Sequence, residues 1–284
     1  MPETYSLGLI GYPLGHSLSP VLHQTALAEA GLNGKYELYT ISPLPEGKKD
    51  LEALLNRLRS GELHGLNVTI PHKQSVFPLV DELTPSAAAM GAVNTLIMKS
   101  GKLVGDNTDA PGFWGDLSHL PIQNARSALV LGAGGAARAV VYALLTRGWS
   151  VRITDLHPEQ AASLYTHYSA QELDSSKLEV IPLSQQALEQ AGTDSDLVVN
   201  TTPMGMHPNV ESCAWPEEIA LPAHTCIYDV VYNPMETRFL KRAAAAGLPC
   251  RNGLGMLVEQ AALAFERWTG YSPSRSRMLE EVRP

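Results

Sequence analysis

The chain has 284 residues, of which 44% are hydrophobic and 18% charged, a composition typical of a folded protein with room for two ordinary domains. Its formal net charge of −8 argues against nucleic acid or an anionic membrane as a partner. The N-terminus lacks the basic region of a signal peptide, and no run approaches the roughly 20 apolar residues of a membrane span. The histidines and the three cysteines (Cys213, Cys226 and Cys250) show no metal-binding spacing, so we expect a cytoplasmic protein with reduced thiols and no metal site.

Strands and helices alternate in the first third of the chain. Short apolar runs predict strands at residues 7–10, 36–41 and 66–70, and apolar periodicity predicts helices at 21–31 and 50–59. A small Ala-rich helix at 86–90 and a strand pair around a Ser-Gly turn at 100–101 close this unit. Alternation of this kind is typical of a parallel sheet with helical crossovers.

A second alternating series begins at Ser127. Its predicted strands are 128–131, 150–155, 178–181, 196–200 and 225–231, its predicted helices are 135–146, 158–169, 184–191 and 236–246, and a last helix is predicted at 256–268. The boundary near 109–115 is expected to be a continuous helix or a short connector. We therefore predict an α/β protein with an N-terminal α/β substrate domain (1–109, completed by 254–284) and a Rossmann-like doubly wound dinucleotide-binding domain (110–253). The active site is expected in the cleft between the domains.

A glycine-rich segment lies where the first strand of this second series ends and a helix begins. Gly132 permits a tight turn, Gly134 lets the backbone approach a pyrophosphate, and Ala137 stands at the helix–strand packing point. The exposed amides at the helix N-terminus bind phosphate without a basic side chain. Because strand, turn, helix and a later acidic residue occur in the required order, the segment predicts a dinucleotide site formed by Gly132, Ala133, Gly134, Gly135 and Ala136.

Asp155 ends the next strand, at the position that meets the adenosine ribose. A carboxylate there accepts hydrogen bonds from both ribose hydroxyls and repels a 2′-phosphate. Residues 156–160 contain no Arg or Lys, so the residues themselves favour NAD over NADP. A helix-capping role for Asp155 is the alternative that the sequence leaves open.

Four segments of the first unit place polar side chains at strand ends and on loops, where parallel sheets carry their chemistry. They read HSLSP at 16–20, GLNVTIPHK at 65–73, GAVNT at 91–95 and GDNTD at 105–109. In the second segment Asn67 and Thr69 alternate with apolar residues, so both lie on one face of a strand. Any one segment could face solvent, but four together indicate a binding site.

These segments, followed by GAGGAAR at 132–138, closely resemble the shikimate dehydrogenase family. The likeness continues through NTTPMG at 200–205, DVVY at 229–232 and GLGMLVEQ at 253–260, in order over the whole chain. The resemblance implies reversible reduction of 3-dehydroshikimate to shikimate, on the route to chorismate and the aromatic amino acids. It also implies a small-molecule substrate, NADP as the usual cofactor, and a monomer or homodimer.

The family's binding roles fall on matching positions of this chain. The resemblance implies that Ser17 and Ser19 hold the substrate carboxylate, with Tyr232 approaching it. The ring hydroxyls are then read by Asn67, Thr69, Asn94 and Gln260. Beside the glycine-rich turn and Asp155, the implied cofactor-binding residues are Thr201, Thr202, Met204, Val230 and Gly253.

Lys73 and Asp109 are the implied catalytic residues. Hydride delivery to a ketone builds negative charge on oxygen, and a positioned acid must neutralise that charge. General acid–base catalysis of this kind is typically worth about 10²–10⁴-fold. An ammonium can donate the proton and also stabilise the developing alkoxide. A neighbouring carboxylate would orient the ammonium and hydrogen-bond the same substrate hydroxyl.

One segment departs from the family pattern. Most biosynthetic members carry Asn-Arg-Thr where this chain has Asp155, Leu156 and His157, so NAD becomes a credible cofactor beside NADP. Three alternative functions stay open at this point. They are a quinate/shikimate dehydrogenase working with NAD in the oxidative direction, a non-catalytic dinucleotide sensor, and a dehydrogenase of a folate or an amino acid. The intact Lys73 and Asp109 disfavour the sensor, and the small Ser, Asn and Thr pocket disfavours the last class.

Overall fold

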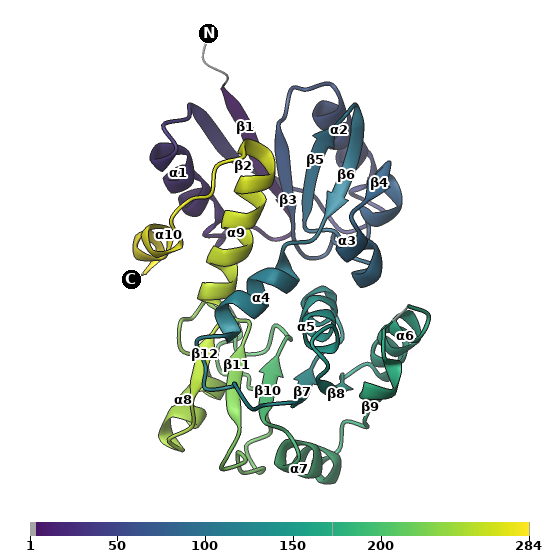
Figure 1. Cartoon of the computed structure of the whole chain (residues 1–284), viewed down its shortest axis with the longest axis vertical. Helices are drawn as coiled ribbons and strands as arrows, with labels where there is room; N and C mark the ends of the chain where they lie inside the picture. Colours follow the sequence, from purple (N-terminus) through teal and green to yellow (C-terminus); the bar gives the residue numbers. More distant parts are fainter. Residues whose placement is uncertain (1–3, 172, 284) are drawn as a thin grey trace. The chain divides into compact units, whose positions relative to one another are not determined.

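The computed structural model describes residues 4–171 and 173–283, and these residues form two compact units. One unit comprises the chain through Gly112 together with the segment from Val258 onward, and the other spans Phe113–Leu257. Figure 1 traces the chain through both. Each unit is an α/β layer structure with its own six-stranded sheet. Among the described residues, no helix combines the length and apolar character needed to cross a membrane.

The sheet of the first unit has the strand order β2-β1-β3-β5-β6-β4. Its strands are β1 (Tyr5–Gly11), β2 (Gly34–Thr40), β3 (Gly65–Val68), β4 (Glu82–Leu83), β5 (Thr95–Lys99) and β6 (Lys102–Asp106). The strands β1, β2 and β3 are parallel, as the alternation of strands and helices predicts, whereas β5 runs antiparallel to both β3 and β6. A two-residue turn joins β5 to β6, with φ of 51° at Ser100 and 78° at Gly101, and such turns connect only antiparallel strands.

Helices cover this sheet and position the polar segments. They are α1 (Ser19–Glu29), α2 (Lys48–Arg59), α3 (Pro85–Met90) and α10 (Arg275–Val282), with α4 (Asp109–Leu117) and α9 (Leu254–Thr269) each shared by the two units. In Figure 1, α9 lies across one face of the sheet and α2 lies behind β5 and β6. Four leucines of α2 (Leu51, Leu54, Leu55 and Leu58) are buried in the core. Burial of each is worth roughly 1.5–3 kcal/mol, so α2 is held by packing.

The second unit has a wholly parallel sheet of order β12-β11-β10-β7-β8-β9. Its strands are β7 (Ser127–Leu131), β8 (Ser150–Thr154), β9 (Leu178–Val180), β10 (Leu197–Asn200), β11 (Cys226–Asp229) and β12 (Cys250–Asn252). Its helices are α5 (Gly135–Leu145), α6 (Pro158–Ser169), α7 (Gln185–Thr193) and α8 (Arg238–Ala245). This is the doubly wound Rossmann order, which reverses between β7 and β10. Ligands of such sheets bind at the carboxyl ends of the strands beside that reversal.

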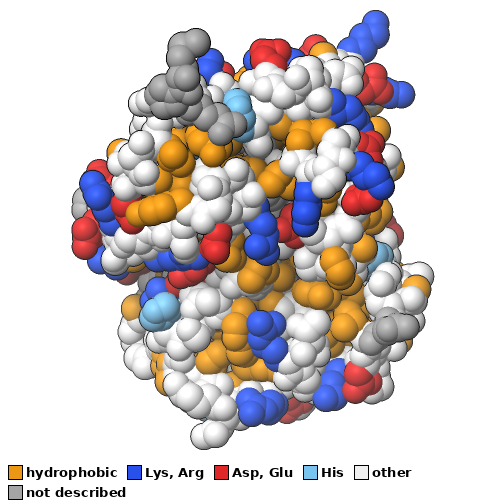
Figure 2. All heavy atoms as spheres, turned by 45° about the horizontal axis from the view of Figure 1, so that its top comes forward, with side chains coloured by type: hydrophobic (Ala, Val, Ile, Leu, Met, Phe, Trp, Pro, Cys, Tyr) orange, Lys and Arg blue, Asp and Glu red, His pale blue; other side chains and the backbone are white. Residues whose placement is uncertain are grey.

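Charged side chains of both signs are interspersed on the face shown in Figure 2. The chain as a whole carries a formal net charge of −8. A negative substrate must accordingly be held by local hydrogen-bond donors and not by a general positive field.

Candidate active site

Lys73 and Asp109 form an ion pair in the first unit, with Lys73 Nζ 2.7 Å from Asp109 Oδ2. Lys73 lies in the turns that follow β3, and Asp109 is the first residue of α4. The Lys73 side chain is 18% exposed and that of Asp109 is 5% exposed. One of the three ammonium protons points at the carboxylate, so two remain for a substrate oxygen.

Asn94 holds the other oxygen of the same carboxylate. Its Nδ2 donates to Asp109 Oδ1 at 2.8 Å, and its Oδ1 accepts from the backbone N–H of Thr108 at 2.8 Å. The same Nδ2 lies 3.5 Å from Oε1 of Gln260 on α9, and the Thr108 hydroxyl donates to the Gln260 carbonyl at 3.0 Å. Asn94, Asp109 and Gln260, from three distant segments, are thus brought together beside Lys73.

Asn67 and Thr69 lie at the carboxyl end of β3. Asn67 is buried on the strand, and its Nδ2 lies 3.3 Å from the carbonyl oxygen of Asn94. Thr69 follows the strand and packs against Gly11, where an added Cβ would lie 2.4 Å from Thr69 Cγ2. Glycine at position 11 therefore makes room for the Thr69 side chain.

Ser17 and Ser19 lie at the start of α1, in the loop after β1. Ser19 is buried as the first residue of the helix, and its backbone N–H donates to Ser17 Oγ at 3.3 Å. The two hydroxyls therefore lie close together at a helix N-terminus, where the helix dipole favours a negative group. Tyr232 is the one predicted substrate residue in the second unit, in the loop after β11. Burial raises the pKa of its phenol, so it stays a neutral hydrogen-bond donor.

The glycine-rich turn has the backbone that a dinucleotide site requires. Gly132 has φ of +104°, and an added Cβ would lie 2.7 Å from Thr201 Oγ1. Gly134 caps α5 with an ordinary φ of −76°, and an added Cβ would have no protein atom within 4 Å. Ala137 is fully buried at the base of the helix. The turn therefore leaves open space in front of the α5 amides, which fits a bound pyrophosphate.

Asp155 contacts this turn directly. Its Oδ2 accepts from the backbone N–H of Ala133 at 2.7 Å, and its Oδ1 accepts from the backbone N–H of His157 at 2.8 Å. The helix that follows begins at Pro158, and its N-cap residue is His157. Asp155 thus bridges the β7–α5 turn and the β8–α6 turn, and each oxygen keeps a lone pair for a ribose hydroxyl.

The remaining predicted cofactor residues also lie at the carboxyl ends of strands in the second unit. Thr201 donates from Oγ1 to the Leu131 carbonyl at 2.8 Å, beside the glycine-rich turn. Met204 lines a hollow of about 730 Å³ formed by residues between Pro203 and Ser212. Gly253 approaches the loop after β11 so closely that an added Cβ would lie 2.1 Å from the Val230 carbonyl oxygen.

Known proteins similar to this chain belong to one family. The family "Shikimate dehydrogenase substrate binding domain" matches residues 9–96, and "Shikimate 5'-dehydrogenase C-terminal domain" matches residues 253–283. Shikimate dehydrogenase (NADP(+)) of Carboxydothermus hydrogenoformans is 40% identical over 281 residues, which is 99% of this chain and 97% of that protein. The chain belongs to the shikimate dehydrogenase family. It is an oxidoreductase with the α/β and Rossmann-like architecture predicted from its sequence.

Two solved structures share the fold over nearly the whole chain. A Thermus thermophilus shikimate 5-dehydrogenase in complex with NADP(H) and shikimate has a TM-score of 0.84 and 37% identity, covering 98% of each chain. A Corynebacterium glutamicum quinate dehydrogenase in complex with NAD has a TM-score of 0.86 and 35% identity, again covering 98% of each chain. Both dinucleotides therefore occur among the relatives of this shikimate dehydrogenase family member.

Sequence reasoning missed a buried polar pair that supports the cofactor loops. Asn200 Nδ2 donates to Asp229 Oδ1 at 2.8 Å, and the same carboxylate oxygen accepts from the Val231 N–H at 3.0 Å. Asn200 Oδ1 in turn accepts from the N–H and the hydroxyl of Thr202, at 2.9 and 2.7 Å. The pair thus joins the loop after β10 to the loop after β11. Both residues lie inside quoted family motifs, but only the strand register places them opposite each other.

Proposed function

We propose that this chain interconverts 3-dehydroshikimate and shikimate with a nicotinamide dinucleotide, in the pathway to chorismate. The observation that carries the proposal is the Lys73–Asp109–Asn94 arrangement, in which one carboxylate is held on both oxygens beside a partly exposed ammonium. The first unit is then the substrate domain and the second the dinucleotide domain. Their matched family segments support the same assignment.

Lys73 manages the proton of the reaction. When bound, the reduced nicotinamide supplies the hydride that converts the ketone carbon to the alcohol carbon. Lys73 donates a proton to the ketone oxygen as negative charge develops there, and its positive charge stabilises that oxygen electrostatically. Asp109 fixes the direction of the ammonium through its 2.7 Å contact. In the oxidative direction Lys73, in its neutral form, accepts the hydroxyl proton, and Asp109 stabilises the ammonium that results.

The other polar side chains of the first unit bind the substrate. Ser17 and Ser19 present hydroxyl donors at a helix N-terminus, which suits the substrate carboxylate. Asn67, Thr69, Asn94 and Gln260 present amides and a hydroxyl to the ring hydroxyls. A site built from such groups discriminates strongly against analogues that lack a hydroxyl, because its buried polar atoms would then be unpaired.

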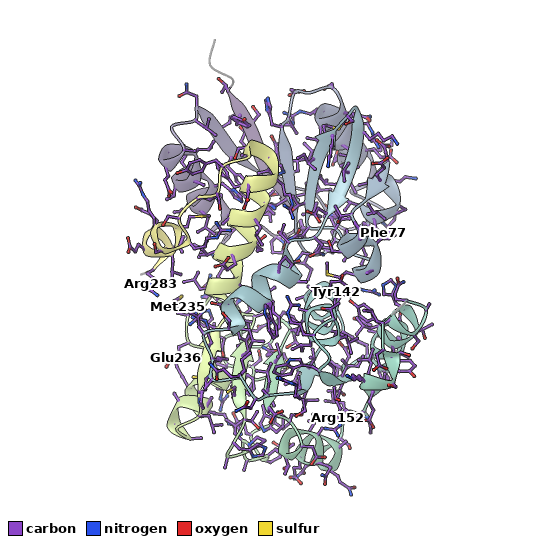
Figure 3. The ribbon with its side chains drawn as sticks, viewed as in Figure 1. Phe77, Tyr142, Arg152, Met235, Glu236 and Arg283 are labelled. Carbon is purple, nitrogen blue, oxygen red and sulfur yellow. The ribbon has the colours of Figure 1, made fainter. Side chains whose placement is uncertain are left out.

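NAD is the cofactor that the adenosine end of the site favours. Asp155 follows β8 at the position that meets the adenosine ribose in this fold, where a carboxylate repels a 2′-phosphate, and residues 156–160 contain no Arg or Lys. The nearby Arg152 on β8 is engaged elsewhere, with Nε 3.1 Å from Glu179 Oε2 and an amino nitrogen 3.8 Å from Asp194 Oδ2. Figure 3 shows Arg152 on the side of the sheet where α7 lies. The curated relatives are named for NADP(+), so this preference is a departure from them.

A spectrophotometric assay at 340 nm tests both parts of the proposal. Shikimate and quinate are each offered with NAD and with NADP, and kcat/KM is measured for the four pairs. We expect shikimate to be oxidised with a higher kcat/KM than quinate, and NAD to give a higher kcat/KM than NADP. No turnover of shikimate with either dinucleotide would overturn the function. A strong preference for NADP would overturn only the cofactor assignment. Faster oxidation of quinate than of shikimate would make quinate the assigned substrate.

A further inference from the structure

Tyr36 lies on β2, next to Asn67 and Ser19, two of the proposed substrate-binding residues. Its hydroxyl donates to Asn67 Oδ1 at 2.8 Å, and the neighbouring Ser19 side chain lowers the pKa of the phenol against the larger rise caused by burial. The tyrosine is buried, so it has no access to solvent as an alternative partner. One phenolic hydroxyl therefore connects the residue proposed for the carboxylate end of the substrate with one proposed for its ring hydroxyls.

The Asn67 amide can take only one orientation in this setting. Its Nδ2 faces the Asn94 carbonyl oxygen at 3.3 Å and Thr95 Oγ1 at 3.4 Å. The Asn94 carbonyl can only accept, and the Thr95 hydroxyl already donates to Asn94 Oδ1 at 2.8 Å. Turning the amide over would place oxygen against both acceptors. Oδ1 must therefore face Tyr36, and Tyr36 must be the donor.

This orientation has a consequence for the substrate. The amide nitrogen is the end of Asn67 that faces Asn94, whose own side chain binds the catalytic carboxylate of Asp109. Its contacts on that side are long, at 3.3 and 3.4 Å, so they are readily exchanged for a better acceptor. A substrate hydroxyl that reaches Asn67 from this side meets a hydrogen-bond donor.

His23 holds the tyrosine ring in place. Its imidazole stacks on the Tyr36 ring with centroids 4.3 Å apart and planes within 6°, and the Trp268 ring lies 5.2 Å from it on another side. Burial lowers the pKa of His23 to about 3, so the ring is neutral at physiological pH. Burial also keeps the Tyr36 phenol protonated by raising its pKa, so the hydroxyl always has a proton to donate.

We propose that Tyr36 is a positioning residue of the substrate site, whose hydroxyl holds the Asn67 amide with its nitrogen toward the substrate. The inference rests on the proposed function, because it takes shikimate as the ligand that Asn67 reads. Tyr36 touches neither substrate nor cofactor in this role. It acts through Asn67, and its loss leaves the buried Oδ1 without its donor, so that only the long contacts of Nδ2 still hold the amide.

Tyr36→Phe removes the hydroxyl and keeps the ring that His23 stacks on. We expect the KM for shikimate to rise about fivefold, the size of one net hydrogen bond, with kcat and the KM for the dinucleotide within twofold. Tyr39→Phe is the matched control. It lies on the same strand, and its hydroxyl bonds the surface carboxylate of Glu37 at 3.0 Å, with Arg57 also beside the ring. Its kinetic constants are expected to stay within twofold of the native chain.

A double-mutant cycle with Asn67→Ala separates a role of Tyr36 in positioning Asn67 from a general effect on the structure of the site. If Tyr36 acts through Asn67, adding Tyr36→Phe to Asn67→Ala raises the KM for shikimate by no more than about twofold. An equal rise in both backgrounds would mean a merely structural role and would overturn the inference. A native-like KM in Tyr36→Phe would do the same while leaving the proposed function intact, whereas a native chain that does not oxidise shikimate would overturn both.

Asn67→Asp is a second test of the inference, for the case in which circular dichroism shows that Tyr36→Phe does not fold. It keeps an acceptor for the Tyr36 hydroxyl and removes the amide donor. We expect its KM for shikimate to rise at least as far as that of Asn67→Ala. A KM equal to that of the native chain would show that the nitrogen does not read the substrate, and the inference would fall.

Discussion

Asn94 donates through Nδ2 to Oδ1 of Asp109 at 2.8 Å, on the carboxylate oxygen that Lys73 does not contact. The backbone N–H of Asp109 is itself held by Asn107 Oδ1 at 2.9 Å. The carboxylate therefore cannot rotate without breaking contacts on both oxygens. Its position fixes where the Lys73 ammonium lies, which is the requirement for a proton donor that must meet one substrate oxygen.

Replacing Lys73 by alanine removes the proposed proton donor and leaves the proposed substrate-binding residues in place. We expect kcat for shikimate oxidation to fall by at least about 100-fold, with the KM for shikimate within several-fold of the native value. Steady-state assays at saturating dinucleotide measure both constants. Lys102→Ala is the control, because Lys102 is an exposed lysine of the same unit that pairs with Glu82 at the surface. Native turnover in Lys73→Ala would refute the assigned role.

Gly134→Ala tests the open space in front of α5. The native φ of −76° suits alanine, and the added Cβ would meet no protein atom within 4 Å. We therefore expect the free energy of unfolding to stay within about 0.5 kcal/mol of the native value. The KM for the dinucleotide should rise at least about tenfold, because the methyl group occupies space that the pyrophosphate needs. An unchanged KM for the dinucleotide would show that this turn is not part of the cofactor site.

Gly132→Ala provides the contrast to this variant. Its φ of +104° is strained for any residue with a Cβ, and the new methyl would lie 2.7 Å from Thr201 Oγ1. We expect this variant to lose stability, by about 1–3 kcal/mol, in chemical denaturation. The two neighbouring substitutions thus separate a glycine required by the fold from a glycine required by the ligand.

Patterns formed by consecutive residues explain why the second unit could be predicted well from the sequence. The strand, glycine-rich turn and helix from Ser127 to Leu145 are consecutive, so their pattern needs no distant partner. The helix α6 is predicted at 158–169 and observed at Pro158–Ser169, since Pro158 marks its first turn. The resemblance placed Lys73 and Asp109 in one catalytic pair, which has the geometry of an ion pair here.

The missed features depend on contacts that are distant along the chain or on segments with little apolar pattern. Helix α10 has a single buried residue, Met278, and strand β12 has only three residues, so neither shows a periodic signal. The Tyr36–Asn67 bond joins residues 31 positions apart through the packing of β2, β1 and β3. The Asn200–Asp229 pair likewise requires the register of β10 and β11, which a sequence alone does not specify.

Asp155→Asn tests the basis of the cofactor preference. The amide oxygen can still accept one of the two backbone hydrogen bonds, while the negative charge that repels a 2′-phosphate is lost. We expect the ratio of kcat/KM for NADP to that for NAD to rise at least about tenfold, which corresponds to about 1.4 kcal/mol. Glu159→Gln is the control, since Glu159 is an exposed carboxylate four residues further on. A ratio that moves equally in both variants would point to general surface charge and not to Asp155.

The free energy of unfolding should depend on pH through the titration of Asp229. Its carboxylate is fully buried, and burial raises its pKa to about 6. Its hydrogen bonds to Thr237, Val231 and Asn200 oppose that rise without cancelling it. Since the folded-state pKa lies above the unfolded value near 4, the folded chain holds a proton that the unfolded chain releases between pH 4 and 6. The stabilisation from this group is complete below about pH 4 and is lost as the pH rises through 6.

Asp229→Asn removes this titration and keeps an acceptor for the Asn200 amide. A shift of about two units corresponds to about 3 kcal/mol, so the free energy of unfolding of the variant, relative to the native chain, should rise by about that amount from pH 4 to pH 7. Urea denaturation at four pH values measures the difference, and any constant effect of the substitution cancels. Asp194→Asn, at an exposed carboxylate of the same unit, should show no such trend. In Asp229→Asn, a difference that is flat between pH 4 and 7 would mean that the buried carboxylate of the native chain is ionised throughout this range. The loops after β10 and β11 would then be joined by a charged carboxylate and not by a contact that depends on a proton.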